Sequence, residues 1–542
     1  MVMSGKRLIA ALLGPLVLIA IPFLLQPAPE ERLSVENAEV LVIITAHSES
    51  IRYEFERAFR DFYRNTFGRE IVIDWRSPGG TSDIVRYIND RFEAAFRDYY
   101  QEKHPEKEWN RAIAANFGNY RLNQKGAWEN ASPEVREARE EFLSSDVGIG
   151  IDLFFGGGVF DQSRLGEQGY AVDGGVQLRH PAIFSEEIIP HSFGGEVFYD
   201  LNGRYYGVCL STFGICYNPE RLAELEDSSP PLTWRDLGEP RFFRQLVVAD
   251  PTKSGSITKC FEMILQQCLQ EAIAADPVNG PENGWRDGMN LIKRIAANSI
   301  SLTDSAGKIP RDVAAGNALA GMCIDFYAFA EAEWSSWQTG GEPRLVYVVP
   351  KGGGAITTDP VQMLRGAPNP QAAQAFMDFL LSKSGQKLWD YRKGEPDGPV
   401  KYVIRRPPIR KDLYQKEFQQ HMADGDYNPY EGQGSFRYDP QLTSSYFNLI
   451  RVLVKCIALD PMEEMQLAWQ EIIRAGGPEK VPEAMKEFEK LPFPYVDAGK
   501  ANDALYTSVD RSAADVTALR RQWTTAAQEQ YLRAAELARQ GK

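Results

Sequence analysis

The sequence lacks the short motifs of common catalytic and metal-binding sites. It has no H-E-x-x-H zinc motif, no G-x-S-x-G nucleophile turn, no phosphate-binding loop ending in Gly-Lys-Ser/Thr and no C-x-x-C pair. Its five histidines form no close pair. These absences argue against hydrolases, nucleotide-dependent enzymes and zinc proteins. We therefore expect a protein that is not an enzyme and that carries no cofactor.

Positive charge is also in deficit. The formal net charge is -14, which argues against nucleic-acid binding because such binding requires clustered Lys and Arg. The six cysteines all lie far from the N-terminus, so none can accept a lipid there. We expect buried free thiols, with disulfide pairing as the alternative for an exported protein. The cysteines are Cys209, Cys216, Cys260, Cys268, Cys323 and Cys456.

The N-terminus carries a pattern typical of export. Lys6 and Arg7 precede an uncharged, mostly apolar run from Leu8 to Leu25. A basic flank followed by such a run indicates a signal peptide or a membrane anchor within residues 1–30. We therefore expect a periplasmic or otherwise extracytoplasmic protein. Whether the leader is cleaved or stays as an anchor is open, because no clear cleavage site follows it.

Strand and helix patterns alternate along the following residues. Val40–Thr45 and Ile71–Trp75 are apolar and rich in β-branched residues, and each is followed by a helical stripe. This alternation predicts an α/β lobe with a largely parallel sheet. Residues from about 91 to 145 are predicted to form a helical insertion, and residues 401–542 a helical extension. Further strands are predicted at Ile149–Phe155, Gly207–Leu210, Ile215–Tyr217, Leu246–Ala249 and Arg344–Val349, the last returning to the first lobe.

Four loops share one design, in which a strand end, a run of Gly, Ser or Thr and a helix follow each other. The first backbone N–H groups of a helix lack partners and carry the positive end of the helix dipole, so small residues there let an anion approach. The alternative is structural, since Ser and Thr are preferred N-caps and Gly is a common turn residue. The loops are Thr45–Ser50, Gly79–Ser82, Gly156–Asp161 and Thr252–Ser256.

Two single residues near these loops have more than one interpretation. His47, a lone histidine, is interpreted as a neighbour of a helix cap, and its position directly after the first predicted strand makes a role in a pocket the alternative. Asp152, on the strand before the three glycines, is interpreted as a structural hydrogen-bond acceptor and not as a general base. Gly156–Gly158 is not a nucleotide fingerprint, because the G-x-G-x-x-G spacing is absent.

An ordered set of segments resembles one known family. The segments are IDLFFGGG (151–158), YGVCLSTFGICYNPE (206–220), LTWRDLGEPRF (232–242), VVADPTKSGS (247–256), AAGNALAGMCIDFY (314–327) and the stretch from Pro368 to Trp389. In this order they resemble the family 1 extracellular solute-binding proteins of ABC importers, especially the ferric-iron-type periplasmic components.

The resemblance implies a fold and a way of working. The expected fold is α/β, of the type II periplasmic-binding-protein class, with two α/β lobes around a cleft, a helical insertion and a C-terminal helical extension. Lobe 1 is expected at 38–206 and lobe 2 at 207–339, with 340–400 returning to lobe 1. Chain crossings are expected near Tyr206–Ser211 and between Ala330 and Arg344. Hinge closure on the solute would signal occupancy to an ABC permease in the inner membrane, with a monomeric binding protein.

The resemblance also bears on the ligand. Ferric-binding relatives commonly use a tandem tyrosine pair, which aligns here with Phe326 and Tyr327, so one phenolate is present. Because Fe³⁺ prefers several hard anionic oxygens, Tyr327 is a metal ligand only if iron is bound, with Asp325 contributing. We expect instead a small anionic or polar solute, including an iron complex. The alternative for Phe326 and Tyr327 is core packing.

The residues expected to bind the ligand come from both lobes. They are His47, Ser48, Gly80, Thr81, Ser82, Gly157, Gly158, Ser211, Thr212, Ser254, Gly255, Ser256, Thr303, Ser305, Asp325, Phe326 and Tyr327. The alternative function is a membrane-tethered periplasmic sensor that presents bound solute to a signalling partner. An enzyme on the same fold would need a reactive pair in the cleft, and the sequence offers none.

Overall fold

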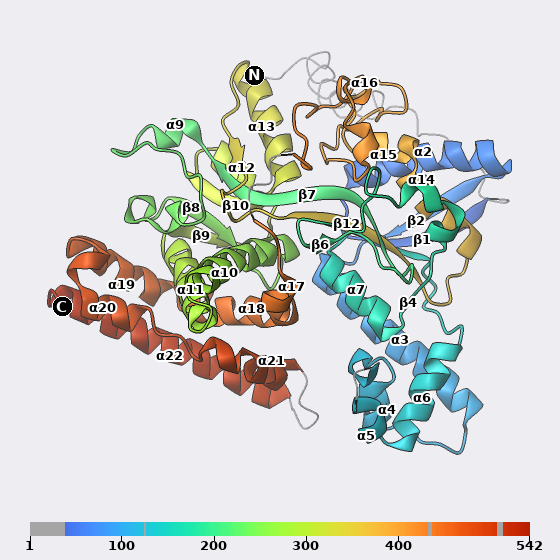
Figure 1. The fold of residues 1–542 in the computed structure, drawn as a ribbon, viewed down its shortest axis with the longest axis horizontal. Helices are drawn as coiled ribbons and strands as arrows, with labels where there is room; N and C mark the ends of the chain where they lie inside the picture. The colour runs from blue at the N-terminus through green and yellow to red at the C-terminus, as the bar shows by residue number, and fades with distance from the viewer. Residues whose placement is uncertain (1–37, 124–125, 432–435, 507–512) are drawn as a thin grey trace, which may run out of the picture.

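The computed structural model describes residues 38–123, 126–431, 436–506 and 513–542. The predicted leader, residues 1–30, lies outside the described residues. In the described residues the chain forms two α/β lobes, with a helical insertion below the first and a helical extension below the second (Figure 1).

Lobe 1 is built on a parallel sheet whose central strand is covered on both sides. Strand β1 (Glu39–Thr45) lies between β2 (Ile71–Arg76) and β3 (Leu153–Phe155). Because successive side chains of a strand point to opposite faces, Leu41 and Ile43 pack under one helical layer and Val42 and Ile44 under the other. The continuous apolar run of this strand follows from that double burial. The covering helices are α2 (Glu49–Phe67) and α14 (Pro370–Leu381) on one face, and α3 (Thr81–Lys103) and α7 (Val159–Gln168) on the other.

Asp152 anchors the end of this sheet. Its two carboxylate oxygens accept hydrogen bonds from the backbone N–H of Val42 at 2.8 Å and of Asn369 at 2.5 Å. The interpretation of Asp152 as a structural acceptor is confirmed. The strand predicted at Ile149–Phe155 is shorter in the structure, where β3 comprises Leu153–Phe155.

Lobe 2 has its own sheet and helices. Strand β8 (Leu246–Ala249) runs parallel to its neighbours β9 (Ser299–Thr303) and β10 (Ala320–Ile324). Two long helices, α10 (Gly255–Ala275) and α11 (Gly280–Ala297), pack on it and on each other. The remaining helices of this lobe are α9 (Pro219–Leu222), η4 (Asp236–Gly238), η5 (Pro240–Phe242), α12 (Lys308–Ala314) and α13 (Asp325–Thr339).

Two strands join the lobes. Strand β7 (Tyr206–Tyr217) pairs antiparallel with β12 (Ile356–Leu364) over its first half and with β10 over its second half. Both run across the molecule in Figure 1. The two strands predicted at Gly207–Leu210 and Ile215–Tyr217 are therefore one continuous strand, and the prediction of two α/β lobes is confirmed.

The predicted position of the second crossing is wrong. Strand β11 (Val346–Val348) pairs with the lobe 2 half of β7, so the strand predicted at Arg344–Val349 does not return to lobe 1. Most of the segment where the crossing was expected, Ala330–Thr339, belongs to α13. The chain returns instead through β12, which contains Asp359 and Pro360 and has a register shift between them. A proline interrupts the ladder pattern, and that is why this segment does not read as a strand.

The predicted insertion is helical, and so is the predicted extension from Pro440 onward, whereas residues 401–431 are mostly irregular and pack on lobe 1. The insertion continues from α3 into η2 (Tyr120–Asn123) and three short helices, and the described residues between 91 and 145 contain no strand. These helices are α4 (Arg111–Asn116), α5 (Ala127–Asn130) and α6 (Pro133–Ser144). The smaller elements around lobe 1 are β4 (Ala171–Val172), α8 (Val176–Arg179), η3 (Pro181–Ile183), β5 (Ser192–Phe193), β6 (Glu196–Val197), α15 (Lys383–Lys387), η6 (Lys411–Leu413) and α16 (Lys416–Gln419).

The extension shares a hydrophobic core with lobe 2. Trp469, Phe488 and Tyr531 are fully buried in the same cluster as Trp285 and Ile292 of α11. Figure 1 shows the extension as the orange and red helices beneath that lobe. Its elements are α17 (Pro440–Thr443), η7 (Ser444–Tyr446), α18 (Phe447–Val454), the π-helical turn η8 (Lys455–Leu459), α19 (Met462–Arg474), η9 (Pro478–Lys480), α20 (Pro482–Phe488), η10 (Tyr495–Asp497), α21 (Ala498–Tyr506) and α22 (Ala513–Arg539).

One helical stretch of the described residues, Pro440–Leu459, is long and apolar enough to cross a membrane by length and composition alone. Its apolar window is 67% buried inside the protein. Leu449, Ile450 and Leu453 from this stretch belong to the core that the extension shares with lobe 2. We therefore interpret the stretch as a core helix.

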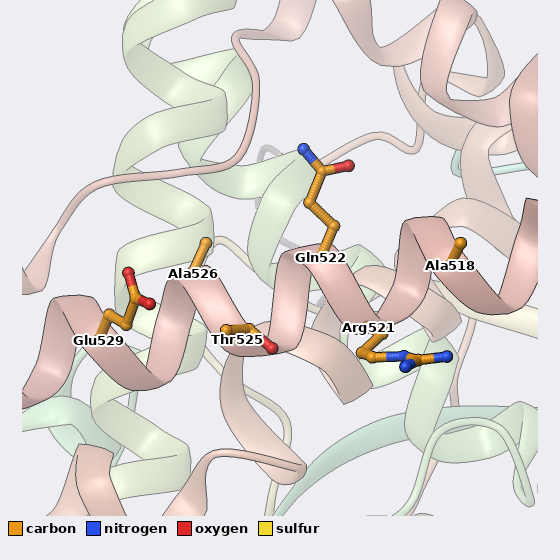
Figure 2. Close-up of a pocket in the computed structure, with 6 residues that line it drawn as sticks. All are labelled: Ala518, Arg521, Gln522, Thr525, Ala526 and Glu529. Atoms are coloured by element: carbon orange, nitrogen blue, oxygen red, sulfur yellow. The ribbon is translucent and has the colours of Figure 1, made fainter.

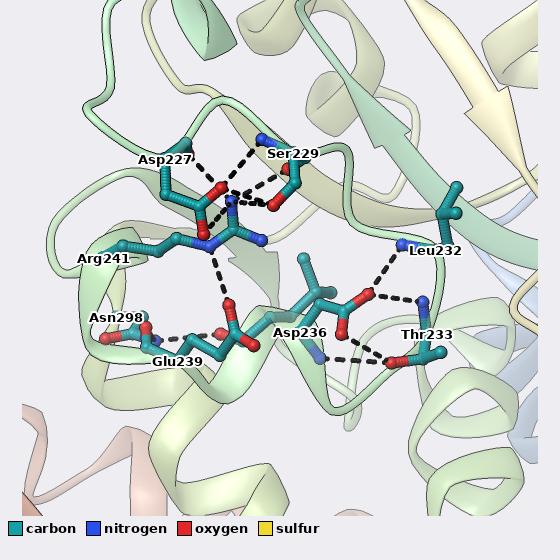
Figure 3. Close-up of polar contacts among 9 residues, drawn as sticks. Asp227, Ser229, Leu232, Thr233, Asp236, Glu239, Arg241 and Asn298 are labelled. Carbon is teal, nitrogen blue, oxygen red and sulfur yellow. Dashed lines mark hydrogen bonds and ion pairs between the residues drawn. The ribbon is translucent and has the colours of Figure 1, made fainter.

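The segment LTWRDLGEPRF forms a tightly bonded turn at the base of lobe 2 (Figure 3). The Asp236 carboxylate accepts hydrogen bonds from the backbone N–H groups of Leu232 and Thr233 and from the Thr233 hydroxyl. The turn buries Trp234, whose indole N–H donates to the carbonyl of Gly353 at 2.9 Å. The residues of this segment therefore secure the fold of the lobe.

Lys293 ties α11 to the extension from a fully buried position. Its Nζ donates to the backbone carbonyls of Phe488 and Lys490, which also accept from the Gln530 amide. Burial lowers the pKa of Lys293 from 10.5 to about 7. Between these two values the unfolded chain holds a proton that the folded chain has released, so this residue makes the free energy of unfolding rise with pH.

We predict that Lys293→Met removes this part of the pH dependence. The difference in the free energy of unfolding between the native protein and the variant should change steadily from about pH 7 to about pH 10, in favour of the native lysine at the higher pH. Urea denaturation of both proteins across this range measures the difference. A difference that stays constant with pH would contradict the buried, readily deprotonated lysine.

Candidate ligand-binding cleft

Three helices begin where the two lobes face each other. The helix α3 starts after Gly80, α7 after Gly158 and α10 after Ser254, whose hydroxyl accepts from the Ile257 N–H at 3.3 Å. Close approaches show that their first turns are neighbours. A Cβ placed on Gly157 would lie 3.0 Å from the Thr81 side chain, and one on Gly80 would lie 3.6 Å from the carbonyl oxygen of Lys253.

The Gly-, Ser- and Thr-rich loops of the two lobes therefore lie side by side. Gly80, Thr81, Ser82, Gly157 and Gly158 of lobe 1 lie together opposite the loop of lobe 2 that ends in Ser254, Gly255 and Ser256. All but Gly80 are partly buried. Ser48 is different, because it is exposed at the start of α2 with its hydroxyl 2.8 Å from that of Ser50. Whether these residues contact a ligand stays a prediction.

Gly156 brings the β3 loop against His47. Its backbone has a φ of 92°, and a Cβ there would lie 2.6 Å from the imidazole Nε2. A side chain is therefore excluded both by the backbone conformation and by space. This close packing joins the glycine loop to a buried polar cluster at the crossing strands.

The cluster centres on an arginine that the sequence analysis did not single out. Arg406 is 2% exposed, and its guanidinium pairs with Asp359 of β12 and donates to the Ser211 hydroxyl of β7 at 2.7 Å. His47 Nε2 lies 3.0 Å from the same Asp359 carboxylate. The ring of Phe326 lies 4.5 Å beneath the guanidinium, a cation–π contact. Both crossing strands are thus joined through one arginine.

The charges of this cluster are set by burial and by Arg406. Burial lowers the pKa of His47 below its usual 6.5, although Asp359 opposes the shift, so the imidazole is neutral at neutral pH. Burial alone would raise the pKa of Asp359, but the charge of Arg406 and the hydrogen bonds from His47 and Arg406 together outweigh it and hold that pKa below the usual value. His47 therefore donates its Nε2 proton to an ionised Asp359.

Asp325 and Thr212 fasten lobe 2 to the same strand. The Asp325 carboxylate accepts from the Thr212 N–H at 2.7 Å, from the Thr212 hydroxyl at 3.1 Å and from the Phe326 N–H at 2.8 Å. Tyr347 and Tyr427 place their hydroxyls 3.0 and 3.3 Å from the same Thr212 hydroxyl. Burial raises the pKa of Asp325 to about 6. Both oxygens of Asp325 are engaged, so this carboxylate acts in the structure as an anchor for α13.

The other lobe 2 candidates lie together at the cleft edge. A Cβ on Gly307 would lie 3.8 Å from the Tyr327 ring and 3.9 Å from the Ser305 hydroxyl, and the Ser305 N–H donates to the Thr303 hydroxyl at 3.2 Å. Tyr327 is 37% exposed. Among the described residues no group of three His, Cys, Asp or Glu side chains gathers where it could hold a metal ion.

A second arginine reaches the cleft from the extension. Arg451 of α18 places Nη1 3.4 Å from the Ser82 hydroxyl of lobe 1 and Nε 3.2 Å from the Thr258 hydroxyl of lobe 2. Figure 1 shows α18 between α10 and α7. Sequence reasoning missed this residue, although one charge within the apolar helix FNLIRVLV signals a buried arginine with partners.

The cysteines and a surface pocket contribute nothing to this cleft. All six cysteines are free and buried, as expected. The pocket in Figure 2 is lined by one face of α22, and its six residues are all exposed. It lies on the outer helix of the extension, away from the strand ends. Its residues are Ala518, Arg521, Gln522, Thr525, Ala526 and Glu529.

We predict that Asp359→Asn lowers the free energy of unfolding by about 3–5 kcal/mol, because it leaves the Arg406 charge buried without its anion. Urea denaturation measures the change. The matched control is Asp74→Asn, which breaks the exposed pair with Arg76 and should cost less than about 1 kcal/mol. Equal, small effects in both variants would show that the buried pair does not hold the crossing strands together.

The sequence matches a known family over its centre. Residues 187–408 match the family model described as bacterial extracellular solute-binding protein. An uncharacterized protein of Haemophilus influenzae is 28% identical over 188 residues, which are 34% of this chain and 48% of that protein. The phosphoglycerate transport regulatory protein PgtC of Salmonella typhimurium is 24% identical over 205 residues, 38% of this chain and 43% of that protein. The chain thus aligns with about half the length of these curated relatives.

Solved structures of binding proteins are similar at low identity. The periplasmic binding protein AfuA of Actinobacillus pleuropneumoniae, with fructose-6-phosphate bound, has a TM-score of 0.46 and 18% identity, over 76% of this chain and 99% of that one. Ferric ion-binding protein A of Pasteurella haemolytica has a TM-score of 0.46 and 12% identity, over 77% and 97%. The matched family is one of binding proteins, in agreement with the expectation of no enzyme. Residues 187–408, which contain lobe 2 and both crossing strands, are thus similar to the bacterial extracellular solute-binding proteins.

Proposed function

We propose that the chain is the solute-binding component of an ABC importer and that it captures a small anionic solute between its lobes. The way in which the two lobes are connected supports this proposal. The two lobes share the strands β7 and β12, so rotation about these strands would open and close the cleft. Loops from both lobes line the opening, so a bound solute would hold them together.

We propose an anionic solute because three helix N-termini lie close together. The first turns of α3 and α7 in lobe 1 and of α10 in lobe 2 are neighbours, and each presents free backbone N–H groups at the positive end of its dipole. The hydroxyls of Thr81, Ser82 and Ser256 add donors, and Arg451 adds a positive charge. A carboxylate or phosphate fits this set of donors.

A phosphorylated carboxylic acid is the solute class we favour. One curated relative is named for phosphoglycerate transport, and such a molecule carries two anionic groups for the two sides of the cleft. Bare Fe³⁺ fits less well. His47 and Asp325 are both engaged in hydrogen bonds within the hinge, which leaves Tyr327 as the single phenolate. An iron complex would bring its own ligands and stays within the proposal.

The proposed location and partner of the protein follow from its proposed role as a solute-binding component. The binding protein would work outside the cytoplasm, in the periplasm, and would deliver its solute to an ABC permease in the inner membrane. It would act as a monomer.

A regulatory role is the second candidate. The relative PgtC is named a transport regulatory protein, and the extension of this chain adds a large helical surface to lobe 2 outside the family match. Deletion of the gene separates the two roles once the solute is known. Loss of solute uptake from a constitutively expressed permease indicates an importer, whereas loss of transporter induction alone indicates a sensor.

We predict that the protein binds phosphoglycerate in isothermal titration calorimetry and that Thr81→Ala and Ser82→Ala each weaken binding by about tenfold or more, because each removes a hydrogen-bond donor to a charged group. Ser228→Ala, in an exposed loop of lobe 2, is the control and should bind as the native protein does. Unchanged affinity in both cleft variants would remove the α3 loop from the site.

A further inference from the structure

We propose that the C-terminal extension completes the binding site, because Arg451 binds the anionic group of the solute directly. The inference rests on the proposed function of anion capture and adds a ligand contact from outside residues 187–408, the part of the chain that matches the family. The extension would then be a third wall of the cleft, beside the two lobes.

The position of Arg451 is defined by both lobes. Its Nη1 lies 3.4 Å from the Ser82 hydroxyl and its Nε lies 3.2 Å from the Thr258 hydroxyl, so it spans the opening from α3 to α10. Asn448 holds Nη1 at 3.2 Å from within α18, and the Phe447 ring lies 4.7 Å from the guanidinium. Phe447 in turn contacts Phe160 of α7, with the ring centroids 4.9 Å apart. The side chain is therefore preorganised before any solute arrives.

One nitrogen of the buried Arg451 guanidinium lacks a hydrogen-bond acceptor. Arg451 is 8% exposed, and its Nη2 is buried without a hydrogen-bond acceptor. The carboxylate of Asp161 lies 4.0 Å from Nη2, at the outer limit of an ion pair and beyond hydrogen-bond length. A buried donor that is left unsatisfied costs about 1–3 kcal/mol, and more when it is charged. An anion supplied by a ligand would satisfy it.

The unsatisfied nitrogen lies at the N-terminus of α10. A Cβ on Gly255, the first residue of that helix, would lie 3.7 Å from Nη2. The free N–H groups of the first turn of α10 and the Nη2 donor therefore lie close together. A guanidinium and a helix N-terminus both favour a phosphate or carboxylate, and the planar guanidinium can bind it through two parallel hydrogen bonds.

The neighbouring lysine of the extension does not compete for this role. Lys455, one turn after Arg451, pairs with Asp250 at 3.1 Å and with Asp460 at 3.2 Å. Asp250 is in turn bonded to the N–H and hydroxyl of Thr252 at the start of the lobe 2 loop. Lys455 thus fastens the extension to the loop, while Arg451 keeps a donor for the solute.

The competing interpretation is a clamp, in which Arg451 only holds the lobes and the extension together. A clamp and a ligand contact predict opposite effects on affinity. Removal of a ligand contact weakens binding of an anion, whereas removal of a clamp leaves binding unchanged or strengthens it by freeing the lobes.

The test is calorimetry with inorganic phosphate and with phosphoglycerate on the native protein, Arg451→Gln and Arg451→Lys. We expect Arg451→Gln to lose about tenfold or more in affinity for each probe and Arg451→Lys to retain part of it, because Lys keeps the charge but not the paired donors. The control is Arg474→Gln, which removes an exposed arginine of α19 in the same extension and should bind as the native protein does. Thermal denaturation confirms that each variant is folded.

The outcomes separate this inference from the proposed function. Anion binding by the native protein that Arg451→Gln keeps or strengthens overturns the role of Arg451 and leaves anion capture standing. Absence of binding of both probes to the native protein overturns anion capture and this inference together. Equal losses in Arg451→Gln and Arg474→Gln would show a general effect of charge and would also overturn the direct contact.

Discussion

Both lobes depend on β7, and β7 depends on a buried charge. This strand of twelve residues belongs to both sheets, and Arg406 binds across its middle to Ser211 and to Asp359 of the partner strand β12. A buried ion pair is stable only while both partners remain. The Asp359–Arg406 pair also positions the neutral His47, which bonds to Asp359, and the glycine loop, which packs against His47. The positions of the loops at the cleft therefore depend on the contacts at the crossing strands.

Much of the fold could be predicted because its strands are buried on both faces. The strands β1 and β8 were predicted to within one residue, since double burial requires continuous apolar runs. Strand β12 could not be predicted, because Asp359 and Pro360 break its apolar pattern. Its aspartate is tolerated only through Arg406, which lies 47 residues further along the chain. The residues around Asp359 in the sequence do not indicate that it has such a partner.

The candidate site divides in the same way. Its backbone loops could be predicted, because Gly, Ser and Thr after a strand end are visible in any window of a few residues. The partners of its two arginines could not be predicted, because they are distant in sequence, and Ser82 lies 369 residues from Arg451. The C-terminal extension, which the sequence analysis treated as an addition to the family fold, places the charge of Arg451 between the lobes. Asp325, which was expected at the ligand, also fastens α13 to β7, a role that the sequence analysis did not predict.

The central claim is that the cleft between the lobes, closed in by the extension, holds an anionic solute. Native mass spectrometry of the protein purified gently from its host, with metal analysis of the same sample, tests this claim most directly. The account predicts one small organic anion per chain, carrying a phosphate or a carboxylate, that is released on unfolding. Stoichiometric iron with no organic molecule, or a neutral or cationic solute, would contradict it.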